Sequence, residues 1–201
     1  FLIYVIYRYL RARSWELENE HPLYKVVNQQ YIHYGKGSVI LYALQDYIGE
    51  VKVNNAMKEF LEKFRYQTPY PTSLDFIKIL ESKVPDSLNY LIDDWFKEIT
   101  LYDNRLKTAF AKKLENGKYE VNIEIEASKM RVDSLGNENK VELNEWIDIG
   151  VFSDPDEENL LHQKRVKVND SLMSFTMIVD SLPSKAGIDP RHILIDRVFS
   201  D

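Results

Sequence analysis

The chain has 201 residues, 44% of them hydrophobic and 29% charged, with a formal net charge of -6. This is the composition of a globular protein long enough to bury a substantial core, in one large domain or two small ones. The absence of cysteine excludes a disulfide framework and a thiolate metal site, and an acidic chain without a basic tract excludes nucleic acid as a partner.

The first seven residues are uncharged and are followed by Arg8, Arg11 and Arg13. This run is too short for a transmembrane helix, which needs about 20 apolar residues. A signal peptide carries its positive charges before the apolar stretch, whereas here they follow it. We therefore predict no transmembrane segment in this chain. We interpret residues 1–10 as a helix whose apolar face packs on another part of a longer protein or on a second copy.

Residues 1–103 are predicted to be helical, because their apolar residues recur at intervals of three and four. The predicted helices are 38–48, 53–66, 72–80 and 88–99. Gly49 is the expected stop of the first of them. Thr72 and Asp75 are spaced as in a capping box, which predicts a helix start at this point.

Residues 104–201 change to alternation with a period of two, which predicts β-strands. In 119–127, apolar and polar residues alternate as in a strand with one solvated face, and Asn116-Gly117 before it is typical of a hairpin turn. The other predicted strands are 106–113, 129–133, 139–143, 146–152, 163–168 and 174–180. Short strands at this regular spacing favour a β-sandwich. The sequence thus predicts an α+β chain with a helical domain over 1–103 and a β-sandwich over 104–201.

Two acidic groups are candidates for chemistry. Asp93 and Asp94 are adjacent, and neighbours on a helix point about 100° apart, so we predict a solvated face rather than an acid–base pair. The segment 154–158 is acidic but lacks the glycine and the ligand spacing of an EF-hand loop, so we predict a plain turn rather than a calcium site. The chain contains no HExxH, GxSxG, P-loop or GxGxxG motif.

The segment 29–38 combines polar and aromatic residues with two glycines around Lys36. One interpretation is a helix N-terminus, with the glycines allowing a sharp entry and His33 packed nearby. The other is a site in which the turn directs the hydroxyl of Tyr34 into a cleft, where an uncharged phenol donates a hydrogen bond to an oxyanion. The spacing of the residues leaves both interpretations open.

The run Tyr34-Gly35-Lys36-Gly37, followed by an apolar helix, resembles the Tyr-x-Lys-Gly segment of the gluzincin aminopeptidases, the aminopeptidase N-like zinc family. The resemblance continues in an ordered series of motifs: Gly49-Glu50, Val53–Tyr66, Thr72–Phe76 and Leu88–Phe96. Further stretches resemble a bacterial subgroup in which such a peptidase is fused behind a permease-like membrane region: Tyr31–Ser38, Ala43–Gly49, Ile99–Asn104, Asp148–Phe152, Gly187–Pro190 and Leu194–Arg197. Together these stretches cover essentially the whole chain.

This resemblance implies the α-helical C-terminal lobe of a thermolysin-like catalytic domain, followed by an Ig-like antiparallel β-sandwich. It implies catalytic zinc in the parent protein, held by an HExxH helix and a later glutamate, with the HExxH glutamate as general base. It gives Tyr34 the role of hydrogen-bond donor to the tetrahedral oxyanion, and it carries no other catalytic residue onto this chain. The expected parent is a zinc-dependent aminopeptidase that removes N-terminal residues from peptides. This chain alone is expected to bind no catalytic zinc and to hydrolyse nothing.

The implied partners are a peptide substrate and the upstream catalytic lobe, against which the apolar face of residues 1–10 would pack unless the chain self-associates. The implied location is a bacterial membrane protein with this part in the soluble phase. An alternative is a degenerate, non-catalytic peptidase-like domain that serves as an interaction or transporter-regulatory module. A third interpretation takes 104–201 as an independent sandwich that binds sugar or protein through a row of exposed aromatic residues. Trp146, beside Ile147 and Ile149 in a predicted strand, is instead expected to lie in the core or to be half-buried.

Overall fold

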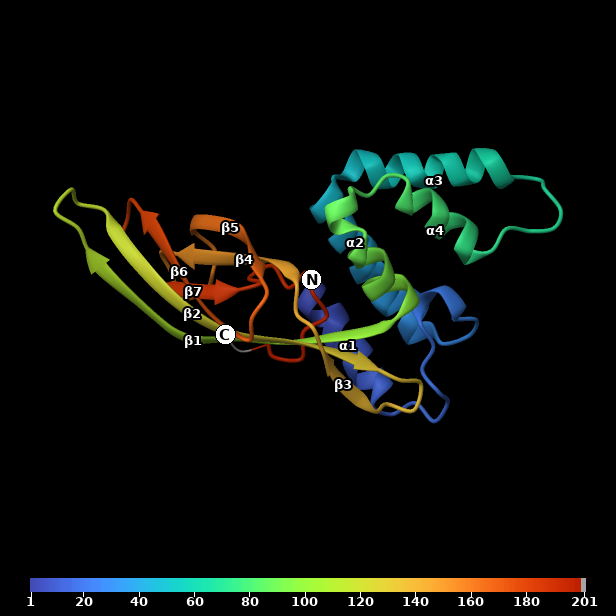
Figure 1. Cartoon of the computed structure of the whole chain (residues 1–201), viewed down its shortest axis with the longest axis horizontal. Coiled ribbons are helices and arrows are strands. Elements are labelled where there is room, and N and C mark those ends of the chain that lie inside the picture. Colours follow the sequence, from blue (N-terminus) through green and yellow to red (C-terminus); the bar gives the residue numbers. More distant parts are fainter. Residues whose placement is uncertain (200–201) are drawn as a thin grey trace. The chain divides into compact units, whose positions relative to one another are not determined.

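The computed structural model of the protein describes residues 1–199. It combines helices with two antiparallel sheets (Figure 1), which confirms the α+β fold class. The chain divides into two compact units. The helical unit comprises Phe1–Thr100, Arg131–Asn139 and Ile193–Ile195, and the strand unit comprises the other described residues.

The helical unit contains five α-helices and four 3-10 or π-helical turns among its described residues. The α-helices are α1 (Leu2–Arg13), α2 (Gly37–Ile48), α3 (Glu50–Phe64), α4 (Ser73–Glu81) and α5 (Tyr90–Ile92). The 3-10 turns are η1 (Leu23–Lys25) and η3 (Asp86–Leu88), and the π-helical turns are η2 (Tyr31–Lys36) and η4 (Asp93–Lys97). Helix α3 packs against both α2 and α4, and Figure 1 shows α3 and α4 side by side. No helix within residues 1–199 is both long and apolar enough to cross a membrane.

Local signals explain where three of these helices begin and end. Gly49 joins α2 to α3 with a φ of 95°, a conformation that glycine adopts without strain. The capping box that opens α4 is present, because the backbone N–H of Thr72 donates to the Asp75 carboxylate at 2.8 Å. The helices predicted over 38–48, 53–66 and 72–80 are therefore confirmed, with ends that differ by up to three residues.

The helix predicted over 88–99 is wrong in its second half. After α5 the backbone widens into the π-helical turn η4, in which the Glu98 N–H donates to the Asp93 carbonyl at 2.9 Å, and a strand begins at Ile99. A π-helical turn inserts one residue into the helical ladder, which shifts the faces on either side of it. Three consecutive residues of this turn, Asp94 to Phe96, are buried as a result.

Residues 1–199 contain seven strands: β1 (Ile99–Lys113), β2 (Tyr119–Val132), β3 (Glu138–Val141), β4 (Glu145–Phe152), β5 (Leu160–Val168), β6 (Leu172–Val179) and β7 (Lys185–Ile188). Strand β2 joins two segments that were predicted to be separate, 119–127 and 129–133. The predicted turn at Asn116-Gly117 is confirmed, with a φ of 85° at the glycine. Strand β1 starts seven residues earlier than predicted from the alternation in 106–113, because its first residues are buried and show no polar face.

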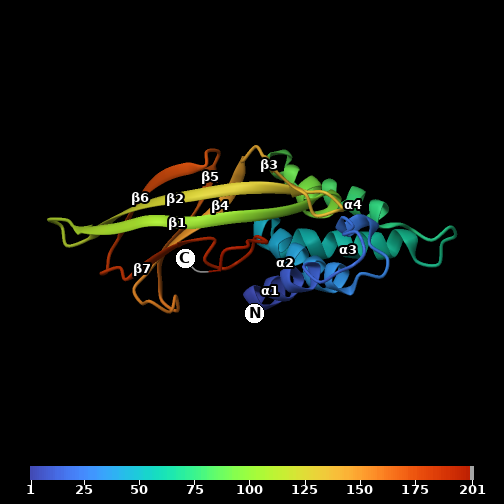
Figure 2. The ribbon, with the colours of Figure 1, turned by 90° about the horizontal axis from the view of Figure 1, so that it is seen from below.

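The strands form two sheets. In one, β1, β2 and β3 are neighbours in that order, and β6 also pairs with β2, placing Ile123 opposite Phe175. Figure 2 shows β1 and β2 running side by side. In the other sheet β4 lies between β5 and β7. The alternation in β2 has the predicted cause, because Val121, Ile123 and Ile125 are buried while their neighbours are partly exposed.

The predicted environment of Trp146 is confirmed. It is half-buried on β4, opposite Lys167 of β5, whose Nζ lies 5.4 Å from the centroid of the indole ring. The neighbouring strand residues Ile147 and Ile149 are fully buried. This tryptophan therefore serves the packing of the sheet.

Candidate functional site

Tyr34 lies on the π-helical turn η2, which continues directly into α2. The glycines around Lys36 do not make the sharp entry that was predicted. Gly37 has φ -60° and ψ -39°, an ordinary helical conformation, and the helical backbone already begins at Tyr31. Helix α2 begins at Gly37, within one residue of the prediction, but residues 31–36 before it are already helical and do not form the expected sharp turn. An amphipathic pattern alone misses the turn, because a π-helical turn does not follow the 3.6-residue period.

The side chain of Tyr34 is 74% exposed and borders two cavities of the helical unit. One cavity, of about 620 Å³, lies between α1 and the segment 30–38. The other, of about 370 Å³, is largely apolar and includes Phe76 and Phe96 in its lining. The ring of His33 packs on Tyr34 at a centroid distance of 4.4 Å, so the expected packing of His33 is confirmed. Within residues 1–199, the Tyr34 hydroxyl has no hydrogen-bond partner.

Lys36, two residues after Tyr34, points into the protein and is only 1% exposed. Its Nζ donates to the backbone carbonyl of Glu98 at 3.3 Å and lies 6.0 Å from the centroid of the Tyr9 ring. Burial lowers the pKa of Lys36 to about 8, although the nearby Glu20 carboxylate acts in the opposite direction. This buried charge ties the Tyr34 turn to the end of η4, and the sequence pattern gave no sign of it.

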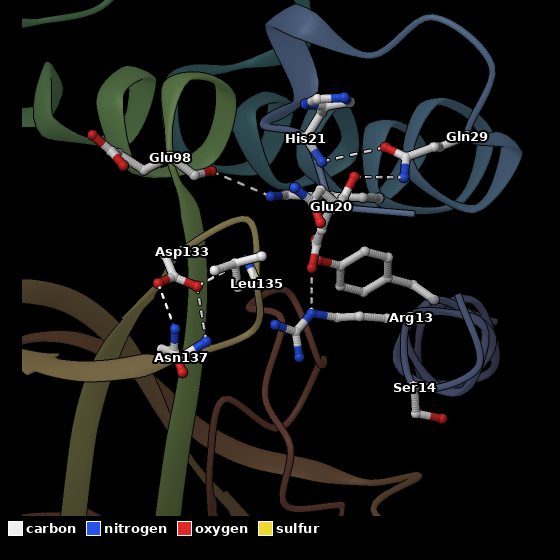
Figure 3. Close-up of polar contacts among 12 residues, drawn as sticks. Arg13, Ser14, Glu20, His21, Gln29, Glu98, Asp133, Leu135 and Asn137 are labelled. Carbon is white, nitrogen blue, oxygen red and sulfur yellow. Dashed lines mark hydrogen bonds and ion pairs between the residues drawn. The ribbon is translucent and has the colours of Figure 1, made fainter. Parts of the chain in front are cut away.

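A second buried charge, Glu20, anchors the chain segment that precedes this turn. Its carboxylate accepts hydrogen bonds from the Tyr9 hydroxyl and from the Arg13 guanidinium, both on α1. Figure 3 shows the Glu20 side chain pointing toward Arg13, with Gln29 beside it. The Gln29 amide donates to the Asn19 carbonyl at 2.9 Å. These contacts fix the segment before η2 to α1, and the backbone that carries Tyr34 follows directly after it.

One of the two adjacent aspartates differs from the prediction. Asp93 is exposed and pairs with Lys97 at 2.9 Å, as a solvated residue would. Asp94 is 2% exposed, and its carboxylate pairs with the Arg131 guanidinium, which also donates to the Thr100 hydroxyl. The prediction of a solvated face is wrong for Asp94, because the π-helical turn carries it inward to a partner distant in the sequence.

The acidic segment 154–158 forms the predicted plain turn. The Asp154 carboxylate accepts backbone hydrogen bonds from Asp156 at 3.1 Å and Glu158 at 3.0 Å. The hydrogen bond from Glu158 is the main reason that the pKa of Asp154 is lowered. Across the part of the chain that the structure describes, no three histidine, cysteine, aspartate or glutamate residues are grouped so that they could hold a metal ion.

Comparison of the sequence with protein-family profiles and with curated proteins gave no match. Among solved structures, the chain is similar to the crystal structure of Legionella pneumophila aminopeptidase A in complex with aspartic acid, with a TM-score of 0.48 and 14% sequence identity. The alignment covers 96% of this chain and 22% of that one, so the chain spans about a fifth of the length of that protein. A similarity of this size does not establish a family for the chain.

The burial of Lys36 leads to a prediction about stability. Because the folded state lowers its pKa from 10.5 to about 8, charged Lys36 opposes folding below pH 8, and this cost is relieved as the pH rises from about 8 to 10.5. Lys36→Met removes the cost together with one hydrogen bond. We therefore expect the variant to have a free energy of unfolding about 1–3 kcal/mol higher at pH 7.

The pH dependence distinguishes this cause from a simple gain of apolar packing. The stability difference between Lys36→Met and the parent chain should shrink in urea titrations between pH 8 and pH 10, where Lys36 loses its proton in the folded state. Lys52→Met, at an exposed position of α3, serves as the control and should change stability by less than about 0.5 kcal/mol. A Lys36→Met chain that is less stable than the parent at pH 7 would contradict the prediction.

Proposed function

We propose that this chain is the C-terminal part of a gluzincin-type zinc aminopeptidase and that Tyr34 donates a hydrogen bond to the oxyanion of the transition state. The observation that carries the proposal is the position of Tyr34. Its hydroxyl has no protein partner within the described residues, it borders two cavities, and its turn is anchored by the buried Lys36 and Glu20. A hydrogen-bond donor held in place before the reaction begins needs no reorganisation when charge develops.

The proposed architecture follows the same resemblance. The helical unit would correspond to the C-terminal lobe of a thermolysin-like catalytic domain, and the two-sheet unit to an Ig-like β-sandwich. The parent protein would be a bacterial membrane protein with this part in the soluble phase. Its upstream catalytic lobe would cover the apolar face of residues 1–10 on which Ile3 and Tyr7 are exposed.

The residues of this chain do not fit a catalytic zinc ion. The sequence has no HExxH motif, and within residues 1–199 no cluster of acidic and histidine side chains is suited to a metal. On this proposal the zinc ligands and the general base come from another part of the parent protein. The contribution of this chain is confined to the oxyanion and to the binding of the peptide.

The chemistry of Tyr34 follows from the hydroxyl group. When a nucleophile adds to a peptide carbonyl, the carbonyl oxygen gains negative charge, and a hydrogen bond to a charged oxygen is roughly twice as strong as one to a neutral oxygen. The Tyr34 hydroxyl therefore stabilises the tetrahedral state more than the substrate, which lowers the barrier. It is not consumed in the reaction.

The experiment that tests the proposal compares the 201-residue chain with the parent protein. The purified chain is expected to release no amino acid from aminoacyl-p-nitroanilides and to retain no stoichiometric zinc after dialysis. The parent protein is expected to release amino acids from these substrates, to retain stoichiometric zinc and to lose activity with a chelator. Chelator-sensitive hydrolysis by the chain alone would refute this division of roles. A folded parent that hydrolyses nothing would refute the enzymatic proposal and favour the degenerate interaction module.

A further inference from the structure

The larger cavity beside Tyr34 has a distinctive chemical lining. It lies between α1 and the segment 30–38 and has a volume of about 620 Å³. Phenylalanine and tyrosine residues are prominent in its walls, and the described lining includes Arg8 but no aspartate or glutamate. The cavity therefore offers hydrogen-bond donors and one positive charge, with no acidic side chain in the wall to neutralise it.

The positive charge of Arg8 is not neutralised by an ion pair within the described residues of the helical unit. The Arg8 guanidinium is exposed and stacks over the Tyr4 ring, with its central carbon 5.8 Å from the ring centroid. Within residues 1–199, no carboxylate lies within ion-pair distance of Arg8. Arg13, on the same helix, is instead paired with Glu20. Of these two arginines of α1, Arg8 is therefore the one able to pair with a ligand in the cavity.

The surrounding charges show which end of the cavity suits an anion. Burial raises the pKa of Tyr31, and the carboxylates of Glu20, Glu16 and Glu18 raise it further, whereas Arg13, which pairs with Glu20, lowers it. Negative charge is therefore in excess on the Tyr31 side. An anion would be repelled there. Arg8 marks the favourable part of the wall.

We infer that this cavity binds a carboxylate group of a peptide and that Arg8 is the residue that selects for it. The forked guanidinium of an arginine can donate to both oxygens of a carboxylate, and the aromatic walls suit the apolar atoms next to it. The inference rests on the proposed function only in naming a peptide as the ligand. The carboxylate belongs either to the C-terminus of a short peptide or to an acidic side chain, and both present the same group to Arg8.

Binding to the 201-residue chain tests this without zinc or turnover. Three N-acetylated probes are titrated and followed by NMR: tri-alanine with a free C-terminus, tri-alanine amide, and Ala-Glu-Ala amide. At least one of the two charged probes is expected to bind roughly tenfold more tightly than the neutral amide, with the preference weakening as salt is added. The stronger charged probe identifies the source of the carboxylate. Equal affinity for all three probes, or no binding, would overturn the inference.

Variants of α1 assign the preference to Arg8. Arg8→Gln should remove the difference between charged and neutral probes, and Arg8→Lys should restore part of it. Arg11→Gln is the matched control, because Arg11 is an exposed arginine of the same helix that stacks over Trp15 and does not line the cavity. A preference that survives Arg8→Gln, or that Arg11→Gln removes equally, would exclude Arg8 as the selecting residue. These outcomes are separate from the oxyanion role. Unchanged turnover of the parent protein after Tyr34→Phe would refute that role, whereas the carboxylate preference of the 201-residue chain would be unaffected.

Discussion

Tyr34→Phe in the parent protein is expected to lower kcat by about 10²–10³ while KM changes little. The substitution removes one oxygen atom from a side chain that is 74% exposed, so the fold should be preserved. The lost hydrogen bond is made to an oxygen that becomes charged only in the transition state. Its loss therefore acts on the chemical step rather than on substrate binding. Steady-state kinetics with a neutral aminoacyl substrate measures both constants.

Tyr42→Phe is the matched control for this substitution. Tyr42 lies on α2, is 52% exposed and lines neither of the two cavities that Tyr34 borders. Loss of its hydroxyl should leave kcat within about twofold of the parent. If Tyr34→Phe also leaves kcat unchanged, or if its whole effect falls on KM, Tyr34 is not an oxyanion donor.

Lys129→Met is expected to lower the free energy of unfolding by about 3–5 kcal/mol. Lys129 and Glu145 belong to the strand unit, and their charged atoms lie 2.6 Å apart with side chains only 9% and 1% exposed. The Glu145 carboxylate also accepts a hydrogen bond from the Tyr102 hydroxyl at 3.3 Å. Removal of the ammonium leaves a buried carboxylate with one positive partner fewer. Calorimetry of the whole chain at pH 7 measures the loss.

Two comparisons identify burial as the cause of this loss. Lys107 and Glu126 form an ion pair of similar length, 3.0 Å, on the exposed side of β1 and β2. Lys107→Met should therefore cost at most about 1 kcal/mol. Adding Glu145→Leu to Lys129→Met removes the buried charge and should recover much of the stability. Equal losses for the buried and the exposed lysine would show that the buried pair contributes no more than a surface pair.

The parts of the fold that were predictable are those in which neighbours along the chain determine burial. The alternation in 119–127 and the apolar stripe of α3 record which face is buried, so strand and helix follow from the period. Gly49 and the Thr72–Asp75 capping box act within a few residues of the ends they define. The sequence alone was sufficient for these elements.

The errors lie where a distant partner determines the structure. Asp94 is buried because Arg131, 37 residues later, donates a hydrogen bond to its carboxylate. Lys36 is buried because its Nζ donates to a backbone carbonyl 62 residues away. Neither pairing leaves a periodic trace in the sequence. The π-helical turns η2 and η4 carry these two residues, and their extra residue breaks the helical period on which the prediction relied.

The candidate site was predictable only in part. The identity of Tyr34 came from a resemblance of short motifs, whereas the two cavities that it borders are formed by side chains from separate segments of the helical unit. No local pattern shows that Arg8 and Tyr34 line one cavity. The anchoring of the Tyr34 turn by Glu20 likewise depends on a loop that folds back onto α1.

The affinity of the parent protein for a tetrahedral inhibitor tests the central claim most directly. A phosphinic dipeptide analogue carries the negative oxygen that the Tyr34 hydroxyl is proposed to bind, and calorimetry measures its Kd without turnover. Tyr34→Phe is expected to weaken this Kd by about 10²-fold while the Kd of the amino acid product changes by less than about threefold. Equal affinity of the parent and Tyr34→Phe for the phosphinic analogue would contradict the oxyanion role of Tyr34.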